Sequence, residues 1–403
     1  MKKIIFSIFC SFLMIINVSA LDIYSEYAVL YNLNDNQVIY EQKKDEKTSV
    51  ASLTKIMTTL VAIEHICNYD EKVVINSSMF TGLAEENAAV IGLKNKQEVT
   101  YNDLLYGVFL GSGADATRAL AISIAGSEDN FVELMNAKAS ELNLQNTHYT
   151  NTVGLDDDNH YSTVNDVAIL LKVAYQNEKF KEIFTTESYI FSDNSLTVTS
   201  TFRKTAQTYG PNPTYILGAK TGYTLDAGRC LASIAFDKEN QITYLLVTTN
   251  AESIYYPVKD AITIYNHYFE NYKYYQLIKK GDLLITLPTK YSNTKEVSFY
   301  AKKDIQKYLP NDLLDYNAVL QYEGKKVITP NMKVNTKIGS IQVMYQDEII
   351  DTIDIILNSK ISFSLIAFII ANKRIIISIG ILIMLTVVML YRMKRKLYRK
   401  YHK

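Results

Sequence analysis

Residues 51–67, ASLTKIMTTLVAIEHIC, are the stretch from which the fold and the chemistry of this chain can be inferred. Apolar residues recur there every three or four positions, which predicts an amphipathic helix from about Ser52 to Cys67. Ser52 and Lys55 would share one face of this helix, with about 5–6 Å between their Cβ atoms. A neutral lysine amine could therefore deprotonate the serine hydroxyl, provided that its pocket lowers its pKa. The backbone N–H and dipole at the helix N-terminus would also favour a developing oxyanion.

The Ser-x-x-Lys pattern is short, and it occurs a second time in this chain at Ser292–Lys295. The second copy lies in a polar, turn-like stretch with no helical periodicity after it, whereas the first copy opens an amphipathic helix. We interpret the second copy as a chance match. Ser52 is therefore the candidate nucleophile.

Two further motifs carry groups that a peptidase could use. Lys220-Thr221-Gly222, followed by Tyr223, precedes a strand pattern. A lysine and a hydroxyl on a strand edge, beside a glycine that permits close approach, could hold a substrate carboxylate. Ser112, in a Ser-Gly-Ala loop between two predicted helices, could relay a proton to a leaving group. Each motif alone is also an ordinary turn or loop, and their order and spacing together favour an active site.

The order of predicted elements indicates an α+β fold, in which a helical cluster packs on an antiparallel sheet. Strands are predicted within 27–41, around a turn at 34–36, and at 229–236 and 242–249. Further helices are predicted at 103–110, 114–125, 128–142, 163–176 and 256–271. Short strand-like segments separated by turn residues then predict a small all-β domain over 274–360.

The N-terminal 20 residues have the composition of a secretory signal. Lys2 and Lys3 precede an apolar run from Ile4 to Val18, and small residues precede the cleavage that we expect after Ala20. This pattern predicts that the rest of the chain is exported. The alternative is an uncleaved N-terminal anchor.

The C-terminal end has the pattern of a membrane anchor. An uncharged run over 375–391 is at the short end of what crosses a bilayer, and Lys373 and Arg374 before it can reach the headgroups. The cluster of basic residues over 392–403 marks a cytoplasmic side. We therefore expect a membrane-associated and transmembrane segment at 361–391, a basic cytoplasmic tail, and a catalytic body outside the cell. The alternative is that the whole tail, 361–403, lies flat on the membrane.

The distribution of charge and of metal-binding side chains excludes other classes of function. The whole chain has a net charge of zero, but residues 1–20 carry two basic residues and residues 361–403 carry nine, and neither segment has an acidic residue. Residues 21–360 therefore have a net charge of −11. An acidic body argues against nucleic-acid binding. The five histidines show no metal-ligand spacing, which argues against a zinc peptidase. Cys67 and Cys230 could form a disulfide, but two buried thiols are the favoured interpretation.

The three motifs are the set found in penicillin-binding proteins and class A β-lactamases. Over nearly its whole length the chain resembles the low-molecular-mass D-alanyl-D-alanine carboxypeptidases. The resemblance includes residues 51–58, 135–139, 144–149, 154–155, 160–166 and 219–231. It implies a serine β-lactamase/transpeptidase-like catalytic domain over 21–273, followed by the β-rich domain and the membrane helix.

The resemblance also implies a serine-type D-Ala-D-Ala carboxypeptidase that acts on the D-Ala-D-Ala end of peptidoglycan stem peptides. Lys55 would activate Ser52, and Ser112 would pass a proton to the departing D-Ala. β-Lactam antibiotics would acylate Ser52 as substrate mimics, and no metal or organic cofactor is expected.

The same resemblance assigns substrate binding to the residues around the third motif. Lys220 and Thr221 would hold the terminal carboxylate of the peptide. Gly222 would allow the strand to approach, and the backbone N–H groups of Ser52 and Tyr223 would form the oxyanion hole.

One position departs from the family pattern, because Ala114 stands where the second motif commonly has an asparagine that helps to orient the lysine. A catalytically degenerate penicillin-binding or scaffold protein therefore stays an alternative, as does a D,D-endopeptidase that uses the same residues. A class A-like β-lactamase is disfavoured because residues 151–158 contain no Glu-x-x-Leu-Asn pattern for activating the deacylating water. His160, in a loop before a Ser/Thr helix start, is interpreted as structural.

Overall fold

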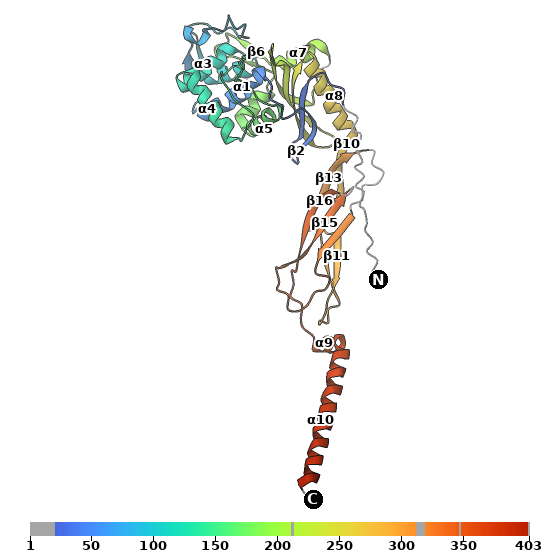
Figure 1. Ribbon diagram of the computed structural model, residues 1–403. Coiled ribbons are helices and arrows are strands. Elements are labelled where there is room, and N and C mark those ends of the chain that lie inside the picture. Colours follow the sequence, from blue (N-terminus) through green and yellow to red (C-terminus); the bar gives the residue numbers. More distant parts are fainter. Residues whose placement is uncertain (1–20, 211–212, 312–318, 346–347, 402–403) are drawn as a thin grey trace. The chain divides into compact units, whose positions relative to one another are not determined.

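The computed structural model describes residues 21–210, 213–311, 319–345 and 348–401 (Figure 1). The chain divides into two compact units, of which the first ends at Glu270 and the second begins at Asn271. The predicted signal, 1–20, lies outside the described residues. Each unit is described by itself below.

The first unit is built on a five-stranded antiparallel sheet with the strand order β2-β1-β9-β8-β7. Strand β1 comes from the start of the unit and pairs with β9 from its end, so distant parts of the sequence meet within the sheet. Strands β8 and β9 are almost wholly buried, as expected for strands that are covered on both faces. The strands are β1 (Tyr27–Asn32), β2 (Gln37–Gln42), β7 (Ile216–Thr224), β8 (Gly228–Asp237) and β9 (Ile242–Ala251).

Figure 1 shows a cluster of helices on one side of this sheet and α8 (Tyr256–Asn271) on the other. Helix α8 is held to the sheet by a 2.9 Å hydrogen bond between the hydroxyls of Tyr265 and Ser233. The cluster includes η1 (Ala51–Leu53), α1 (Thr54–His65), α2 (Tyr101–Phe109), α3 (Ala114–Ala125), α4 (Glu128–Glu141), α5 (Val164–Ala174) and α6 (Glu178–Thr185), and α7 (Thr201–Tyr209) packs against β7.

Helix α1 runs through the core of the cluster and has only its last two residues exposed. The sequence predicted that this helix begins near Ser52, but Ser52 lies in the 3₁₀ turn η1 and α1 begins at Thr54. Ala51 has a φ of +46°, in the left-handed region, so the chain enters η1 through a sharp bend. This bend presents the nucleophile candidate just ahead of the helix.

Several short elements of the first unit were not predicted from the sequence. They include α6 and α7. They also include η2 (Ser77–Phe80) and the strand pairs β3 (Lys72–Val74) with β4 (Glu98–Thr100) and β5 (Ser188–Ile190) with β6 (Thr197–Thr199).

The second unit confirms the predicted all-β domain. Its strands pair antiparallel as β10-β13, β11-β12 and β14-β15-β16 around a core of aliphatic and aromatic side chains. The strands are β10 (Tyr272–Ile278), β11 (Leu283–Pro288), β12 (Glu296–Tyr300), β13 (Ile305–Pro310), β14 (Val319–Gly324), β15 (Lys337–Tyr345) and β16 (Glu348–Ile356).

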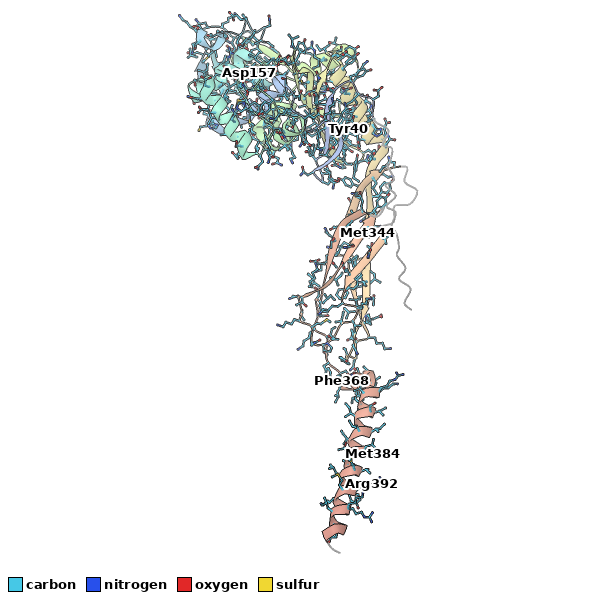
Figure 2. The ribbon with its side chains drawn as sticks, in the orientation of Figure 1. Tyr40, Asp157, Met344, Phe368, Met384 and Arg392 are labelled. Atoms are coloured by element: carbon cyan, nitrogen blue, oxygen red, sulfur yellow. The ribbon has the colours of Figure 1, made fainter. Side chains whose placement is uncertain are left out.

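Two helices follow the β domain, the short α9 (Leu365–Ala371) and the long α10 (Lys373–Tyr401). Residues Lys373–Tyr398 are long and apolar enough to cross a membrane, and none of the most apolar part is buried within the protein. In Figure 2 the side chains along α10, Met384 and Arg392 among them, project away from the helix without a protein neighbour.

The two cysteines of the described chain are both free thiols. Cys230 is buried in the sheet, as predicted, whereas Cys67 is exposed just beyond the end of α1. The prediction of two buried thiols was therefore wrong for Cys67, because α1 ends before this residue and leaves it in a surface loop.

Candidate active site

The hydroxyl of Ser52 and the amine of Lys55 lie in direct contact. Lys55 Nζ donates to Ser52 Oγ at 2.9 Å and to the backbone carbonyl of Val153 at 2.8 Å. The Lys55 side chain is almost wholly buried, and this burial lowers its pKa from 10.5 to about 7, although the carboxylate of Asp115 acts in the opposite direction. A large share of the amine is therefore neutral near pH 7 and can accept a proton.

Lys220 extends from the edge strand β7 into the same site. Its Nζ donates to Ser112 Oγ at 2.9 Å and to the carbonyl of Thr221 at 2.9 Å. Burial lowers the pKa of Lys220 well below its ordinary value, and the positive charge of Lys55 acts in the same direction. The two amines are therefore near neighbours, and the three sequence motifs converge on one place.

The edge strand can approach η1 because Gly222 has no side chain. A Cβ at this position would lie 3.0 Å from the backbone nitrogen of Ser52 and 3.1 Å from the Cβ of Ala51. Next along the strand, the half-exposed ring of Tyr223 stacks against the guanidinium of Arg229 at 3.6 Å. The backbone of the third motif thus runs directly beside the nucleophile candidate.

Thr201, at the start of α7, is a neighbour of the site that sequence reasoning missed. Its hydroxyl lies 2.5 Å from the hydroxyl of Thr221, so it orients the side chain of the third motif. No local pattern marked Thr201, because α7 was not predicted and the contact spans 20 residues of sequence.

The loop that carries Ser112, together with the start of α3, is held by residues 89–93. Ser112 has a φ of +54°, which is strained for a residue with a side chain. The buried carboxylate of Asp115 accepts the backbone N–H groups of Ile91, Gly92 and Leu93 at 2.9–3.0 Å. The side chain of Ile91 fills space that a Cβ at Gly113 would occupy. These contacts together hold the loop in its strained conformation.

The side chain of Ala114 is packed among apolar neighbours and leaves no empty space. It is fully buried and packs with Leu83 and Val153, and its N–H donates to the carbonyl of Ala89 at 2.7 Å. The Val153 carbonyl is the second hydrogen-bond acceptor for the Lys55 amine. The lysine is therefore held at two points although position 114 provides no amide.

The loop that supplies the Val153 carbonyl is shaped by Asn151. The side-chain oxygen of Asn151 accepts the N–H groups of Val153, Gly154 and Leu155 at 2.7–3.2 Å. His160 secures the same region, because its ring lies 2.8 Å from the Thr54 hydroxyl and accepts the Thr150 N–H at 3.2 Å. Burial lowers the pKa of His160 to about 4, so this histidine is neutral.

We expect Gly154→Ala to be strongly destabilising and to impair the site. Gly154 has a φ of +88°, and a Cβ there would lie 1.9 Å from the Ala51 carbonyl oxygen, so the loop or η1 must move. The expected loss is about 2 kcal/mol or more of unfolding free energy. The measurement is denaturant unfolding together with penicillin labelling.

Gly126→Ala is the matched control for that change. Gly126 has a similar φ of +80° but nothing within 4 Å of its Cβ position, so the control carries only the backbone strain. Equal losses in the two variants would contradict the inferred packing of Gly154 against η1.

The second Ser-x-x-Lys match lies far along the chain from these residues, in the turn between β11 and β12. The hydroxyl of Ser292 accepts the backbone N–H of Thr294 at 3.2 Å, which is an ordinary turn contact. The segment opens no helix.

Comparison with known proteins agrees with this geometry. Residues 14–253 match the family model of D-alanyl-D-alanine carboxypeptidase, peptidase S11, and residues 272–362 match that of the penicillin-binding protein 5 C-terminal domain. The chain is 29% identical over 281 residues to the D-alanyl-D-alanine carboxypeptidase DacF of Bacillus subtilis, covering 69% of this chain and 70% of the relative. It is 26% identical over 331 residues to DacD of Escherichia coli, covering 79% and 82%.

A solved structure, penicillin-binding protein 5 from Haemophilus influenzae, has the same fold with a TM-score of 0.64 at 24% identity, covering 85% of this chain and 98% of that one. The S11 model spans more than half of the chain and includes all three motifs that converge at Ser52. The chain therefore belongs to the D-alanyl-D-alanine carboxypeptidase family of penicillin-binding proteins.

Proposed function

We propose that this protein removes the terminal D-Ala from peptidoglycan stem peptides through an acyl-enzyme on Ser52, and that penicillins acylate the same residue. The observation that carries the proposal is the 2.9 Å contact between Lys55 Nζ and Ser52 Oγ, made by an amine whose pKa is lowered to about 7. A serine hydroxyl is a weak nucleophile until an adjacent base accepts its proton.

In the acylation step, neutral Lys55 takes the proton of Ser52 while Oγ attacks the carbonyl carbon of the penultimate D-Ala. The oxyanion is stabilised by the backbone N–H groups of Ser52 and Tyr223, which belong to neighbouring segments packed at Gly222. The C–N bond then breaks, and Ser112 passes a proton to the departing amine and receives in its place the proton that Lys55 took from Ser52. Water hydrolyses the ester and restores Ser52.

Lys220 and Thr221 hold the free carboxylate of the substrate. Without a ligand, burial keeps the pKa of Lys220 low, but a carboxylate within hydrogen-bond distance favours the charged ammonium. A bound substrate carboxylate therefore favours the ammonium form of Lys220, and the ion pair forms where Thr201 already orients the Thr221 hydroxyl. A free carboxyl end on the substrate is thus the recognised feature.

We further propose that a single C-terminal helix anchors the protein, with the catalytic domain on the outer side of the membrane. This proposal is supported by α10 and by the basic residues that follow its apolar part. The proposed segments are a signal at 1–20, a catalytic domain at 21–273, a β-rich domain at 274–360, a membrane segment at 361–391 and a cytoplasmic tail at 392–403.

The test of the enzymatic function incubates the purified full-length protein with a fluorescent penicillin and, separately, with a pentapeptide that ends in D-Ala-D-Ala. Labelling together with release of free D-Ala supports the proposal. Labelling without D-Ala release points to a substrate-binding or scaffold protein, and rapid turnover of the penicillin points to a β-lactamase. Either of these last two results would overturn the proposed carboxypeptidase.

A further inference from the structure

The junction between the β domain and α10 contains a separate helix with its own caps. The hydroxyl of Ser364 accepts the N–H of Ala367 at 3.3 Å and so begins α9, and the side chain of Asn372 donates to the Phe368 carbonyl at 2.8 Å at its end. Figure 1 shows α9 as a short segment between the β strands and α10. Helix α9 is therefore a distinct structural element and not the first turns of α10.

Tyr291 fastens this element to the turn between β11 and β12. Its carbonyl accepts the N–H of Ser364 at 2.9 Å, and its ring lies 5.0 Å from the ring of Phe368, which Figure 2 labels at the junction. Just before α9, Ile361 is buried in the core of the β domain. We name residues 289–295 and 361–374 the collar, and these contacts fix its two parts to each other.

The collar exposes apolar side chains next to the membrane helix. Every residue of α9 is apolar. Phe363, Leu365, Ile366 and Ile370 are 58%, 62%, 72% and 63% exposed, respectively. Soluble proteins rarely expose a contiguous apolar group of this kind unless something covers it.

The charges of the collar have one sign. Its four basic residues, Lys290, Lys295, Lys373 and Arg374, form no ion pair in the part of the chain that the structure describes. The sequence has no acidic residue between 289 and 295 and none after Asp354. Exposed apolar side chains beside cations without an acidic partner are complementary to the headgroup layer of a bilayer that contains anionic lipids.

We propose that the collar lies in the headgroup layer of the outer leaflet and binds anionic glycerophospholipids. The side chains of α9 enter the acyl boundary, and Lys290, Lys373 and Arg374 contact lipid phosphates. This inference rests on the proposed membrane anchor and adds that the turn of the β domain is itself docked on the bilayer. The second Ser-x-x-Lys match then belongs to a lipid-facing turn.

The test uses the absence of tryptophan from this sequence, which makes a single introduced tryptophan an unambiguous probe. Three full-length variants, Ile366→Trp, Leu385→Trp and Tyr300→Trp, are reconstituted in phosphatidylglycerol–phosphatidylcholine vesicles that contain lipids brominated near the headgroup or deep in the acyl chain. Ile366 represents the collar, and Leu385 the middle of α10. Tyr300 represents the exposed surface of β12, where it is 56% exposed.

Shallow bromines should quench Ile366→Trp more than deep bromines do, and the order should reverse for Leu385→Trp. Tyr300→Trp should be quenched by neither. If Ile366→Trp is quenched as little as Tyr300→Trp while Leu385→Trp is quenched, the collar proposal fails and the anchor stands. If Leu385→Trp is not quenched, the anchor itself fails.

A second measurement tests the choice of anionic lipid. Replacing Lys290, Lys373 and Arg374 with Gln in the Ile366→Trp background should weaken shallow quenching by about twofold or more in vesicles with phosphatidylglycerol. In pure phosphatidylcholine the same replacement should have little effect. Equal behaviour in the two lipid mixtures would overturn the headgroup assignment.

Discussion

The Ser52→Ala variant is expected to lose covalent labelling by penicillin and to release D-Ala roughly 10⁴- to 10⁶-fold more slowly than the wild type. The reason is that the variant lacks the oxygen that forms the acyl-enzyme, while the carboxylate-binding residues stay in place. Binding of the peptide should therefore change much less than turnover. Labelling is read by gel fluorescence, and D-Ala release is measured with saturating pentapeptide.

Ser292→Ala is the matched control, since it removes a serine from the same four-residue pattern elsewhere in the chain. It should label and turn over like the wild type, because the Ser292 hydroxyl makes only a turn contact with the Thr294 N–H. Labelling that persists in Ser52→Ala and vanishes in Ser292→Ala would show that the assignment of Ser52 as the nucleophile is wrong.

The second large effect concerns Lys55. Because burial lowers its pKa from 10.5 to about 7, the amine is an ammonium below this pH and a neutral base above it. The rate of acylation by a β-lactam should therefore rise with pH through about 7. Lys55→Arg keeps a positive charge at every working pH and should acylate about 10²- to 10⁴-fold more slowly. Stopped-flow acylation rates on both sides of neutrality measure both effects.

The carboxylate of Asp115 provides a control for the pH profile of acylation. The carboxylate of Asp115 on α3 raises the pKa of Lys55. Asp115→Asn removes that charge and keeps one side-chain oxygen, which can accept the N–H groups of Gly92 and Leu93 but not also that of Ile91. The loss of the charge should move the midpoint of the profile to lower pH. A rate that does not vary around neutrality, or an arginine variant as fast as the wild type, would contradict the role of Lys55 as base.

Much of the candidate site could be predicted from the sequence because its central contact is local. Ser52 and Lys55 are three residues apart, and helical geometry alone brings such side chains together. The strands β8 and β9 were also predictable, since two runs of apolar residues flank a polar turn at 237–240. The apolar composition of the C-terminal end likewise indicated α10 without any tertiary information.

The contacts that the sequence could not reveal join segments that are far apart in the chain. Lys220 and Ser112 are separated by 108 residues, and Lys55 and the Val153 carbonyl by 98. Thr201 meets Thr221 only because α7 packs against β7. None of these contacts has a periodic or compositional signature.

The sequence by itself therefore indicated which residues are candidates for the chemistry, that an α+β unit is followed by an all-β unit, and which end resembles a membrane anchor. Only the tertiary structure decided that Val153 supplies the second acceptor for Lys55 above an apolar Ala114, and that Tyr291 joins the β domain to α9. The physical reason is that helix and strand geometry act over a few residues, whereas these contacts depend on how whole elements pack.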